Sequence, residues 1–571
     1  MALAGIKLDR QKIIIVAGAA VTVSVSVAVA AGVGWWLGGR FVKKKYRDRR
    51  LNPQAKQQPS HSEHMSSFSS QEWNSLPAEG ERRDSVRIDF QSSGDVRQRK
   101  VSIPQVPVQH PVTSGPVSSY DDNADVQENI VLVMVGLPGR GKTAVANRTA
   151  RYLAFFHGAE VEVFNVGDKR RRAKGYMKGE EYDFRNRKNM DQRMKYSYDT
   201  LQDMKDFLKQ KNGRIGIFDA NNVTRDRRKW ILQELQDLDG RAQVIFVELV
   251  NKRAMIYQAE MAEDDVKSAS KPRDSVEDYK KRVAHYMDFY EPLASGGRLD
   301  DPEQQYAYIK CIENGTQIIL NKIKGYMPGR ITQFITNCCH VHWMTQKKLY
   351  FSRHGQSEYN AAGRIGGDSD LTEMGERYAL ALKEFAEERI CVDSETRKAI
   401  PARLWTSTLK RTVRTARHIS TSVIQRDNGE PWIQMKARHW SNLDEIYAGA
   451  CDGLTYAEIK ERYAKEAAAR KKNKLAYRYP RGESYLDVIQ RLEPIIQEIE
   501  RHRESLLIVG HQGILRMIYA FYKGIDREQA PHQTLELNHV IELNPHAYRT
   551  NEKIYNLLPY EEAGDDGQKQ H

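Results

Sequence analysis

The first strong pattern along the chain is an uncharged, mostly apolar run from Ile13 to Gly39. As a helix that rises about 1.5 Å per residue, this run is longer than the roughly 30 Å hydrocarbon core of a bilayer. Trp35 and Trp36 lie near its end, where an interfacial aromatic belt is expected. The pattern predicts a retained transmembrane anchor, 13–39, behind a short N-terminal segment, 1–12; the alternative is a cleaved leader.

Charge on either side orients the predicted anchor. Basic residues are denser after the run than before it, and the more basic flank of a span tends to stay cytoplasmic. We therefore expect a membrane-anchored protein whose catalytic domains face the cytosol. Either the mitochondrial outer membrane or the endoplasmic reticulum fits this pattern.

Residues 40–125 form a basic juxtamembrane segment followed by a disordered linker. The linker is rich in Ser, Gln, Pro and Asp and has no sustained apolar period, which is typical of solvated chain. Ser85 and Ser102 each have basic residues two and three positions before them. A basophilic protein kinase prefers that spacing, so both serines are candidate phosphorylation sites, with chance occurrence as the alternative.

Beyond the linker, short apolar runs alternate with helix-compatible segments. Runs at 130–135, 214–218 and 243–250 are typical of buried parallel strands. This alternation predicts an α/β fold with doubly wound sheets. We expect two such domains, at 126–345 and 346–560, followed by a tail, 561–571.

Composition narrows the class. The chain has 571 residues, 40% hydrophobic and 29% charged, which excludes wholesale disorder, collagen and a polytopic membrane protein. Its net charge of +14 favours anionic partners. We expect no nucleic-acid partner, because no stacked-aromatic or zinc-finger pattern accompanies the charge. Five cysteines without metal-ligand spacing indicate a reducing compartment; Cys338 and Cys339 are either a redox pair or two buried thiols.

A phosphate-binding loop follows the first predicted strand. Residues 136–143 read G-L-P-G-R-G-K-T, and a helix-compatible segment comes next. This is the full strand, loop and helix context of a nucleotide-binding motif, and a glycine turn without nucleotide is the alternative. Backbone N–H groups of such a loop surround phosphate oxygens, Lys142 brings charge to the β- and γ-phosphates, and Thr143 ligates Mg²⁺. The candidate ATP-binding residues are Gly136, Gly139, Arg140, Gly141, Lys142 and Thr143.

Asp219 ends the second predicted strand of this domain. A carboxylate at the carboxyl end of a strand beside a phosphate loop suits Mg²⁺ binding or deprotonation of an acceptor hydroxyl. Asp219 is therefore a candidate catalytic and metal-binding residue, together with Lys142 and Thr143.

A second set of chemical residues lies in the C-terminal half. Arg353 and His354 follow one predicted strand, His511 follows another, and Arg411 and Glu445 lie between them. A neutral imidazole accepts a phosphoryl group, and arginine forks match phosphoryl oxygens. A carboxylic acid donates a proton to a leaving oxygen. These residue types predict a phosphohistidine chemistry.

Five stretches in this order resemble one bifunctional family. They are VMVGLPGRGKT, VFNVGDKRRR, FDANNVTRDRR, RHGQSEYNAAGRIGGDSDLTEMG and YRYPRGESYLDVIQRLEP. The first three resemble the kinase half of 6-phosphofructo-2-kinase/fructose-2,6-bisphosphatase. The last two resemble its bisphosphatase half, a member of the histidine phosphatase (phosphoglycerate mutase-like) superfamily. The resemblance implies ATP and Mg²⁺ as cofactors, and fructose 6-phosphate and fructose 2,6-bisphosphate as substrates. It also implies regulation of glycolysis and gluconeogenesis, with a homodimer left open.

The resemblance also implies roles for single residues. His354 would be the phosphorylated nucleophile, and Glu445 the general acid and later the base for water. Arg353, Arg411 and His511 would hold the transferring phosphoryl group. Residues implied in substrate binding are Arg170, Arg171 and Arg225 in the kinase half, and Asn360, Tyr456, Arg478, Arg481, Gln512 and Arg516 in the phosphatase half.

Two departures from the family pattern motivate a rival. The segments 184–189 and 262–267 differ, and the second is acidic where the family is basic. Reversed charge near a sugar-phosphate site weakens anion binding. One alternative is therefore a phosphatase with a degenerate, nucleotide-binding kinase domain. Another alternative is a membrane-tethered interaction protein without turnover.

Overall fold

The computed structural model describes most of the two predicted domains. The described residues are 129–174, 185–210, 213–238, 242–251, 272–294, 301–339, 347–426, 428–546 and 550–558. The predicted anchor 13–39, the linker with Ser85 and Ser102, and the tail lie outside them. So do Phe184 and the acidic segment 262–267.

The predicted membrane location is corrected by the structure. Across the residues that the structure describes, none of the helices is both long and apolar enough to span a bilayer. The 23-residue helix α4 (Arg187–Lys209) has the length, but charged residues recur throughout it. The prediction of a membrane anchor with cytosol-facing domains on the mitochondrial outer membrane or endoplasmic reticulum rested on the run 13–39, its basic flanks and the cysteine usage, and this finding contradicts it.

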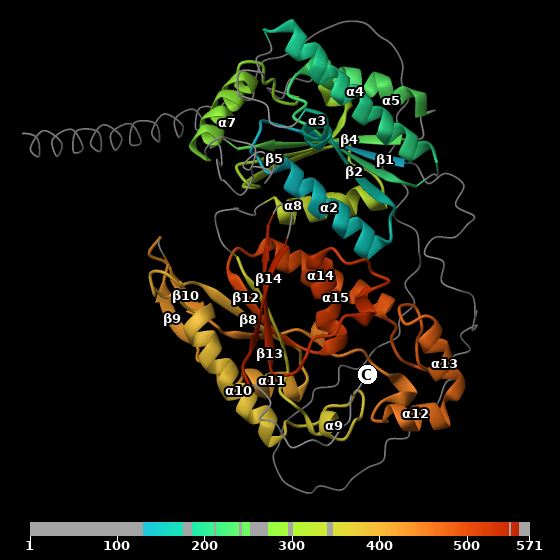
Figure 1. The fold of residues 1–571 in the computed structure, drawn as a ribbon, viewed down its shortest axis with the longest axis vertical. Coiled ribbons are helices and arrows are strands. Elements are labelled where there is room, and N and C mark those ends of the chain that lie inside the picture. The colour runs from blue at the N-terminus through green and yellow to red at the C-terminus, as the bar shows by residue number, and fades with distance from the viewer. Residues whose placement is uncertain are drawn as a thin grey trace, which may run out of the picture. The chain divides into compact units, whose positions relative to one another are not determined.

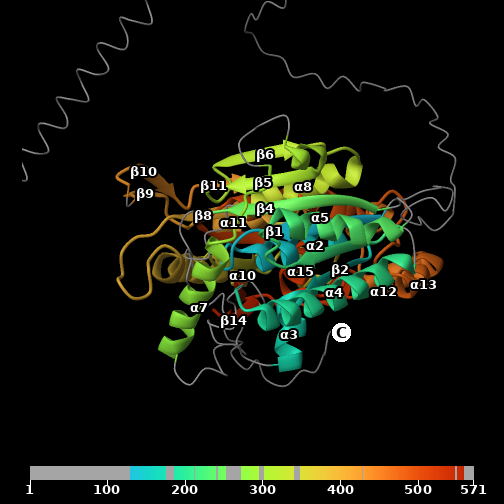
Figure 2. The same cartoon turned by 90° about the horizontal axis from the view of Figure 1, so that it is seen from above.

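The first domain is built on a six-stranded sheet with the order β2-β3-β1-β4-β5-β6 (Figure 1). Figure 2 shows β6, β5, β4 and β1 in succession. Neighbouring strands are parallel except at the edge, where β6 runs antiparallel to β5. The strands are β1 (Asn129–Val135), β2 (Val161–Asn165), β3 (Ile215–Asp219), β4 (Ala242–Val250), β5 (Ala307–Ile312) and β6 (Gln317–Asn321).

Helices cover both faces of this sheet because alternate residues of β1 point to opposite sides. Ile130, Leu132 and Met134 share a core with α2 and α8, whereas Val131, Val133 and Val135 share one with α4 and α5. The other helical elements are α2 (Lys142–His157), α3 (Val166–Lys174), α5 (Arg225–Leu235), η3 (Gln236–Leu238), α7 (Pro272–Met287), η4 (Pro302–Gln305) and α8 (Tyr326–Cys338).

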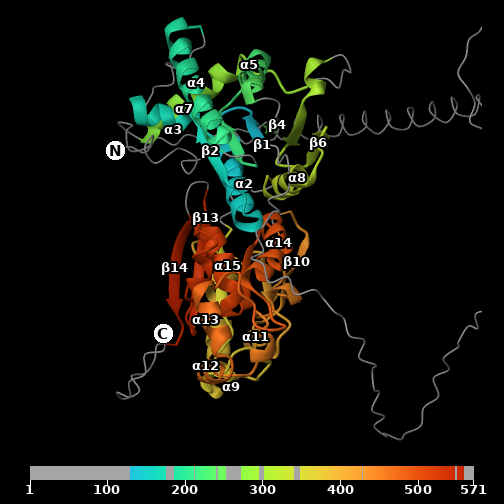
Figure 3. The same cartoon turned by 90° about the vertical axis from the view of Figure 1, so that its right-hand side faces the viewer.

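The second domain has a six-stranded sheet with the order β11-β8-β12-β7-β13-β14. Four strands are parallel, whereas β13 runs antiparallel to both β7 and β14; Figure 3 shows β13 beside β14. The strands are β7 (Leu349–Arg353), β8 (Ala402–Thr406), β11 (Ala437–His439), β12 (Ser505–Gly510), β13 (His539–Pro545) and β14 (Thr550–Asn556), with a separate hairpin of β9 (Ser422–Gln425) and β10 (Pro431–Gln434).

The central strand β12 is buried along its whole length. Its residues Leu506 and Ile508 share a core with α14 and α15, and Leu507 and Val509 share one with α10. The helical elements are α9 (Glu358–Ala361), α10 (Glu373–Phe385), η5 (Ala386–Ile390), α11 (Lys410–Ala416), η6 (Ser441–Leu443), η7 (Gly449–Cys451), α12 (Tyr456–Arg462), α13 (Ala464–Lys472), α14 (Tyr485–Arg501), α15 (Gln512–Lys523) and η8 (Ala530–His532). The α/β prediction is therefore confirmed, as two mixed sheets.

Candidate active sites

The phosphate loop connects β1 to α2. Gly136, Gly139 and Gly141 have φ values of 136°, 64° and 81°, a region that favours glycine. A Cβ at Gly136 would lie 2.7 Å from the carbonyl oxygen of Leu249, so this position also needs the absence of a side chain. Gly141 provides no side-chain cap for α2. Backbone N–H groups in the first turn of α2 are thus available to a phosphate.

Lys142, Thr143 and Asp219 converge at the loop. Lys142 Nζ donates to the carbonyl of Leu137 at 2.7 Å. Burial raises the pKa of Asp219, although a hydrogen bond from Thr143, the charge of Lys142 and a hydrogen bond from Asn165 oppose that shift. A hydroxyl and a carboxylate side by side supply the oxygen ligands that Mg²⁺ prefers.

Asn165 completes this group and was missed from the sequence. It ends β2, and the strand register places it opposite Asp219. Its Nδ2 donates to Asp219 Oδ2 at 2.5 Å and lies 3.5 Å from Thr143 Oγ1. Asn165 therefore orients the carboxylate, and its position at a strand's carboxyl end was the available signal.

Arg140 of the loop points toward the end of β4. Its Nε donates to the carbonyl of Asn251 at 2.8 Å, and its Nη1 donates to Pro138 at 3.3 Å. The side chain is buried. In this arrangement Arg140 ties the loop to β4, whereas it was predicted to bind nucleotide.

A cationic cluster surrounds the hydroxyl of Tyr286 on α7. Arg193 of α4 donates to this hydroxyl. Burial acts to raise the pKa of Tyr286, but the charges of Arg193, Arg282 and Arg170, with a hydrogen bond from Asn221, outweigh burial and lower it. A site that stabilises a phenolate also favours a phosphate ester. Of these residues only Arg170 was predicted from the sequence.

Arg227 on α5 also belongs to this cluster. Its guanidinium lies 4.4 Å from the centre of the Trp230 ring, and its Nε lies 3.4 Å from Asn222 Oδ1. Burial lowers the pKa of Arg227 to about 10, with Tyr286 and Arg193 as its charged neighbours. Arg227 is therefore a further arginine of this cluster, close enough to Tyr286 for their charges to interact, and it was missed from the sequence.

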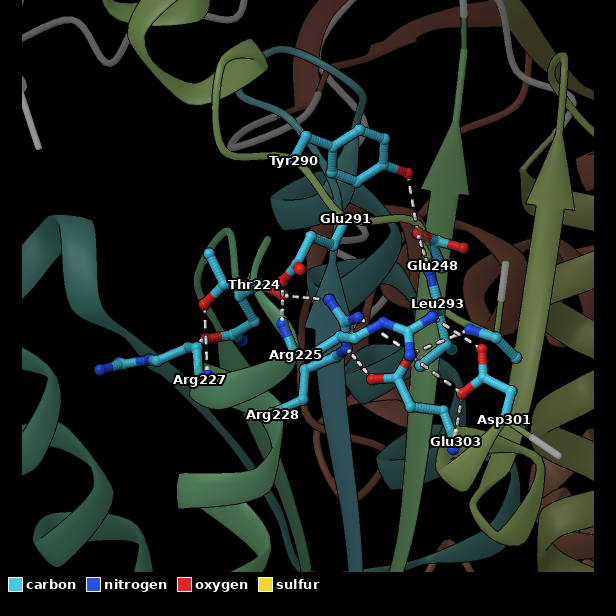
Figure 4. Close-up of polar contacts among 12 residues, drawn as sticks. Thr224, Arg225, Arg227, Arg228, Glu248, Tyr290, Glu291, Leu293, Asp301 and Glu303 are labelled. Atoms are coloured by element: carbon cyan, nitrogen blue, oxygen red, sulfur yellow. Dashed lines mark hydrogen bonds and ion pairs between the residues drawn. The ribbon is translucent and has the colours of Figure 1, made fainter. Parts of the chain in front are cut away.

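The predicted Arg225 has a different environment. Figure 4 shows it paired with Asp301, over 2.7 Å. Three positions further along α5, the buried Arg228 makes a two-pronged pair with Glu303 at 2.7 and 3.0 Å. Glu248 accepts from Tyr290 and Leu293 in the same network. Arg171, another predicted ligand, pairs with Asp168. The structure thus places Arg225 and Arg171 in ion pairs within the protein.

Two histidines meet at the carboxyl ends of adjacent strands. His354 follows β7 and His511 follows β12, and these strands are parallel neighbours in register. The two ring centres lie 5.2 Å apart, and both side chains are buried. Arg411, at the start of α11, donates from Nε to His354 Nε2 at 3.1 Å. The imidazoles and the guanidinium therefore converge on one point.

Hydrogen bonds hold both rings in place, and one of them fixes the tautomer of His354. His354 Nδ1 lies 2.8 Å from the carbonyl oxygen of Gly355, so Nδ1 carries the proton and Nε2 keeps its lone pair. His511 Nε2 lies 2.7 Å from Ser407 Oγ. Ser407, at the end of β8, was missed from the sequence and holds the second ring in place.

Both histidines are neutral in this environment. Burial lowers the pKa of His354 well below its usual value, and the charges of Arg411 and Arg353 lower it further. Burial has the same effect on the pKa of His511, with Arg411 and His354 as the next causes. Arg353 is half-buried, and its desolvation lowers its pKa to about 10. The site therefore combines neutral imidazole with positive charge, which suits attack on a phosphoryl group.

Glu445 follows η6 in the chain and lies in space beside the first turn of α15. Its Oε1 accepts from the backbone of Ile446 at 2.9 Å, and its Oε2 is 3.4 Å from the N–H of Gly513. A Cβ at Gly513 would lie 2.4 Å from Glu445 Oε1, so a larger residue at this position would displace the carboxylate. Arg491 supports this segment by donating to the carbonyls of Asn442 and Asp444 at 2.5 and 2.8 Å. Glu445 is thus held beside the helix that His511 precedes.

The predicted substrate ligands of this domain divide into two groups. Three are engaged with the protein: Asn360 caps α9 through Ser357, Arg478 pairs with Asp487, and Arg516 donates to the carbonyl of Pro531 at 2.5 Å. The others are more accessible. Tyr456 is 59% exposed. Arg481 lies in a turn with a positive φ of 64°, and Gln512 is the first residue of α15.

Two further basic residues, missed from the sequence, gather near Arg516. Burial lowers the pKa of Lys474 to about 8, and the charges of Arg516 and Arg470 contribute. Burial also lowers the pKa of His532, with Lys474, Arg516 and Arg470 as further causes. Glu445 and Arg470 both act on Tyr485, which Arg516 contacts. A cluster of basic residues, Arg470, Lys474, Arg516 and His532, therefore lies toward the Glu445 side of the site.

The two sites define a phosphoryl-transfer protein with a P-loop domain followed by a histidine phosphatase domain. Family models agree: 6-phosphofructo-2-kinase matches residues 118–342, and the histidine phosphatase superfamily (branch 1) matches 349–557. The chain belongs to the 6-phosphofructo-2-kinase/fructose-2,6-bisphosphatase family. The kinase family implies the use of ATP, so the prediction of ATP as a cofactor is confirmed for the family to which the chain belongs.

Curated relatives cover both domains. Human 6-phosphofructo-2-kinase/fructose-2,6-bisphosphatase 3 is 34% identical over 489 residues, which is 83% of this chain and 86% of the relative. The Saccharomyces cerevisiae fructose-2,6-bisphosphatase is 34% identical over 76% of this chain and 89% of its own length. An Arabidopsis thaliana 6-phosphofructo-2-kinase/fructose-2,6-bisphosphatase is 38% identical over 75% of this chain, and the match spans about half, 54%, of that longer relative.

Proposed function

We propose that this chain both makes and hydrolyses fructose 2,6-bisphosphate. Synthesis would transfer the γ-phosphoryl group of ATP to O2 of fructose 6-phosphate, and hydrolysis would pass through a phosphohistidine. The observation that carries the proposal is the pair of neutral imidazoles, His354 and His511, 5.2 Å apart with Arg411 on His354 Nε2. The relatives that match both domains carry these two activities in their names.

In hydrolysis, His354 Nε2 would attack the phosphorus of the 2-phosphate. Arg353, Arg411 and His511 would bind its oxygens, where positive charge and N–H donors stabilise the transferring group. Glu445 would give a proton to the leaving O2 and then take one from the attacking water. The cluster of Arg470, Lys474, Arg516 and His532 would bind the other phosphate, with Tyr456, Arg481, Gln512, Asn360 and Arg478 as the predicted rim.

In synthesis, the loop 136–143 would bind the phosphates of ATP through its backbone N–H groups and Lys142. Thr143 and Asp219 would hold Mg²⁺, because a hydroxyl and a buried carboxylate share Asn165 as a neighbour. Magnesium, when bound, neutralises charge on the β- and γ-phosphates. The cationic cluster at Tyr286, with Arg170, Arg193 and Arg227, would bind the phosphate of fructose 6-phosphate.

The two rivals are not favoured. A phosphatase with a degenerate kinase domain was suggested by 184–189 and 262–267, yet the kinase family model spans both segments. A binding protein without turnover does not explain a neutral histidine pair that three hydrogen bonds hold in place. The bifunctional function is therefore the better account of the chain.

The test is an assay in both directions with the purified full chain. One reaction supplies ATP, Mg²⁺ and fructose 6-phosphate, and the other supplies fructose 2,6-bisphosphate. We expect both activities in wild type, synthesis alone in His354→Ala, and hydrolysis alone in Lys142→Met. Hydrolysis without synthesis in wild type would contradict the bifunctional proposal and support the phosphatase-only rival. If wild type had neither activity, both the bifunctional proposal and the phosphatase-only rival would be contradicted.

A further inference from the structure

Three of the five cysteines line one pocket beside the phosphate loop. Cys311 lies in β5, Cys338 is the last residue of α8, and Cys339 follows it. The same pocket is lined by Arg140 and Gly141 of the loop. The other two cysteines, Cys391 and Cys451, lie in separate clusters of the second domain. A thiol chemistry at this pocket would therefore act next to the phosphate loop of the first domain.

The contacts of the three thiols distinguish them. Cys338 is 1% exposed, and its Sγ is directed to the carbonyl of Ile335 at 3.7 Å. Cys339 is 9% exposed, and its Sγ lies 3.5 Å from the carbonyl of Thr336. Cys311, on the neighbouring strand, meets Cys339 rather than Cys338 in a hydrogen bond. The structure thus pairs two cysteines that are distant in sequence.

The pairing also divides their acidity. The hydrogen bond from Cys311 lowers the pKa of Cys339, against the effect of burial. The same hydrogen bond, with burial, raises the pKa of Cys311 well above its usual value. Burial raises the pKa of Cys338 in the same direction. Since the thiolate is the reactive form, Cys339 is the nucleophile of the group, and Cys311 is the thiol that can resolve its oxidised form.

We propose that Cys339 and Cys311 form a peroxide-sensitive dithiol that closes to a disulfide at the phosphate loop. The Cys339 thiolate attacks one oxygen of a hydroperoxide, the O–O bond breaks, and Cys339 becomes a sulfenic acid while hydroxide leaves. The sulfur of Cys311 then attacks the sulfenic sulfur, the S–O bond breaks, and water leaves. In sum, two thiols lose two electrons, and hydrogen peroxide is reduced to two molecules of water.

Closure changes the shape of the pocket. A disulfide holds its two sulfur atoms about 2.05 Å apart, closer than two hydrogen-bonded thiols. The bond therefore draws β5 and the end of α8 together, and the pocket that contains Gly141 and Arg140 narrows. Resting on the proposed function, this predicts that peroxide slows synthesis of fructose 2,6-bisphosphate and leaves its hydrolysis unchanged.

The first test locates the bond. The full chain is reduced, treated with hydrogen peroxide, blocked with N-ethylmaleimide and digested with trypsin without reductant. Trypsin releases Cys311 in peptide 311–322 and both Cys338 and Cys339 in peptide 331–347. We expect these two peptides to be linked in wild type and in Cys338→Ser. The link should be lost in Cys339→Ser, in Cys311→Ser and in Cys311→Val, which keeps a strand-compatible side chain.

A link that persists in Cys339→Ser, or a wild-type chain that forms none, would overturn the proposal. The second test measures both activities of the oxidised full chain before and after dithiothreitol. We expect synthesis to fall on oxidation and to recover on reduction in wild type and Cys338→Ser, whereas hydrolysis does not change. Equal loss of both activities would contradict the proposal that the disulfide slows synthesis by narrowing the pocket. Failure of the proposed function would instead leave the reduced protein without synthesis while the linked peptide still forms.

Discussion

Arg411 donates a hydrogen bond from its Nε to Nε2 of His354 over 3.1 Å. The other ring nitrogen of His354 faces the carbonyl of Gly355, so the lone pair of Nε2 is directed at the guanidinium. A phosphoryl group that approaches Nε2 would meet the arginine at the same point. This contact therefore joins the nucleophile to the charge that stabilises its transition state.

Replacing Arg411 by alanine should slow hydrolysis of fructose 2,6-bisphosphate by about 10²–10³, the usual cost of removing one preorganised donor. Synthesis should be unaffected, because Arg411 lies in the other domain. Arg414→Ala is the matched control, since Arg414 lies on the same helix and pairs with Asp370 at the surface, 3.3 Å away. Steady-state rates in both directions check the prediction, and similar rates for the two variants would contradict it.

The neutral histidines predict a loss of stability in acid. His354 and His511 have folded pKa values well below the usual one, whereas in the unfolded chain histidine titrates near about 6.5. Below that pH the unfolded state binds more protons. Each histidine should then cost about 1.4 kcal/mol of the free energy of unfolding per pH unit, until its folded pKa is reached.

Urea unfolding of the second domain between pH 7.5 and 5, followed by pulse proteolysis, measures this loss. In the double variant His354→Gln and His511→Gln the decline should be shallower than in wild type. His502, whose pKa burial lowers to about 4, contributes equally to both proteins and cancels. Identical slopes in the two proteins would show that these imidazoles are protonated in the folded state.

Some of the site was predictable because the chemistry needs contiguous residues. The phosphate loop is one such case, since loop and helix follow each other in the chain. His354 and His511 were predictable for a related reason, because both follow apolar strands whose carboxyl ends meet at one edge. Asn165 was not, because it reaches Asp219 only through the register of β2 with β3.

The arginines of the first domain could not be assigned to the site from the sequence. Arg225 and Arg227 are two positions apart on a helix, so they point to roughly opposite sides. Nothing in the sequence tells which of them faces the site, and the family resemblance was applied to Arg225. In the second domain, Arg470 and Lys474 lie in a basic run that is typical of a solvated helix face. Only the fold brings them to Arg516.

Arg227→Ala should raise the KM for fructose 6-phosphate by about 10- to 100-fold, the value of a charged hydrogen bond to a phosphate. The KM for ATP should change little, because Arg227 belongs to the cationic cluster around Tyr286. Arg225→Ala is the control, since Arg225 pairs with Asp301, and its main effect should be on stability. Initial-rate kinetics separates the two, and a larger rise in KM for Arg225→Ala would reverse the assignment.

The buried pair of Arg228 and Glu303 predicts a large stability effect. Both side chains are inaccessible, and removing one partner leaves an uncompensated charge. Glu303→Leu should destabilise the first domain by about 3–5 kcal/mol. The double variant with Arg228→Met removes both charges and should be considerably more stable than Glu303→Leu. Urea midpoints of the two variants provide the test; a double variant no more stable than the single one would disagree with it.

The most direct test of the central claim is to find the phosphoryl group on the enzyme. The full chain is mixed with fructose 2,6-bisphosphate labelled at the 2-phosphate, quenched in alkali within the first turnover, and digested with trypsin. The two histidines separate, because His354 falls in peptide 354–364 and His511 in peptide 504–516. We predict acid-labile label in peptide 354–364. Label in peptide 504–516, or none in either, would contradict a reaction through phospho-His354.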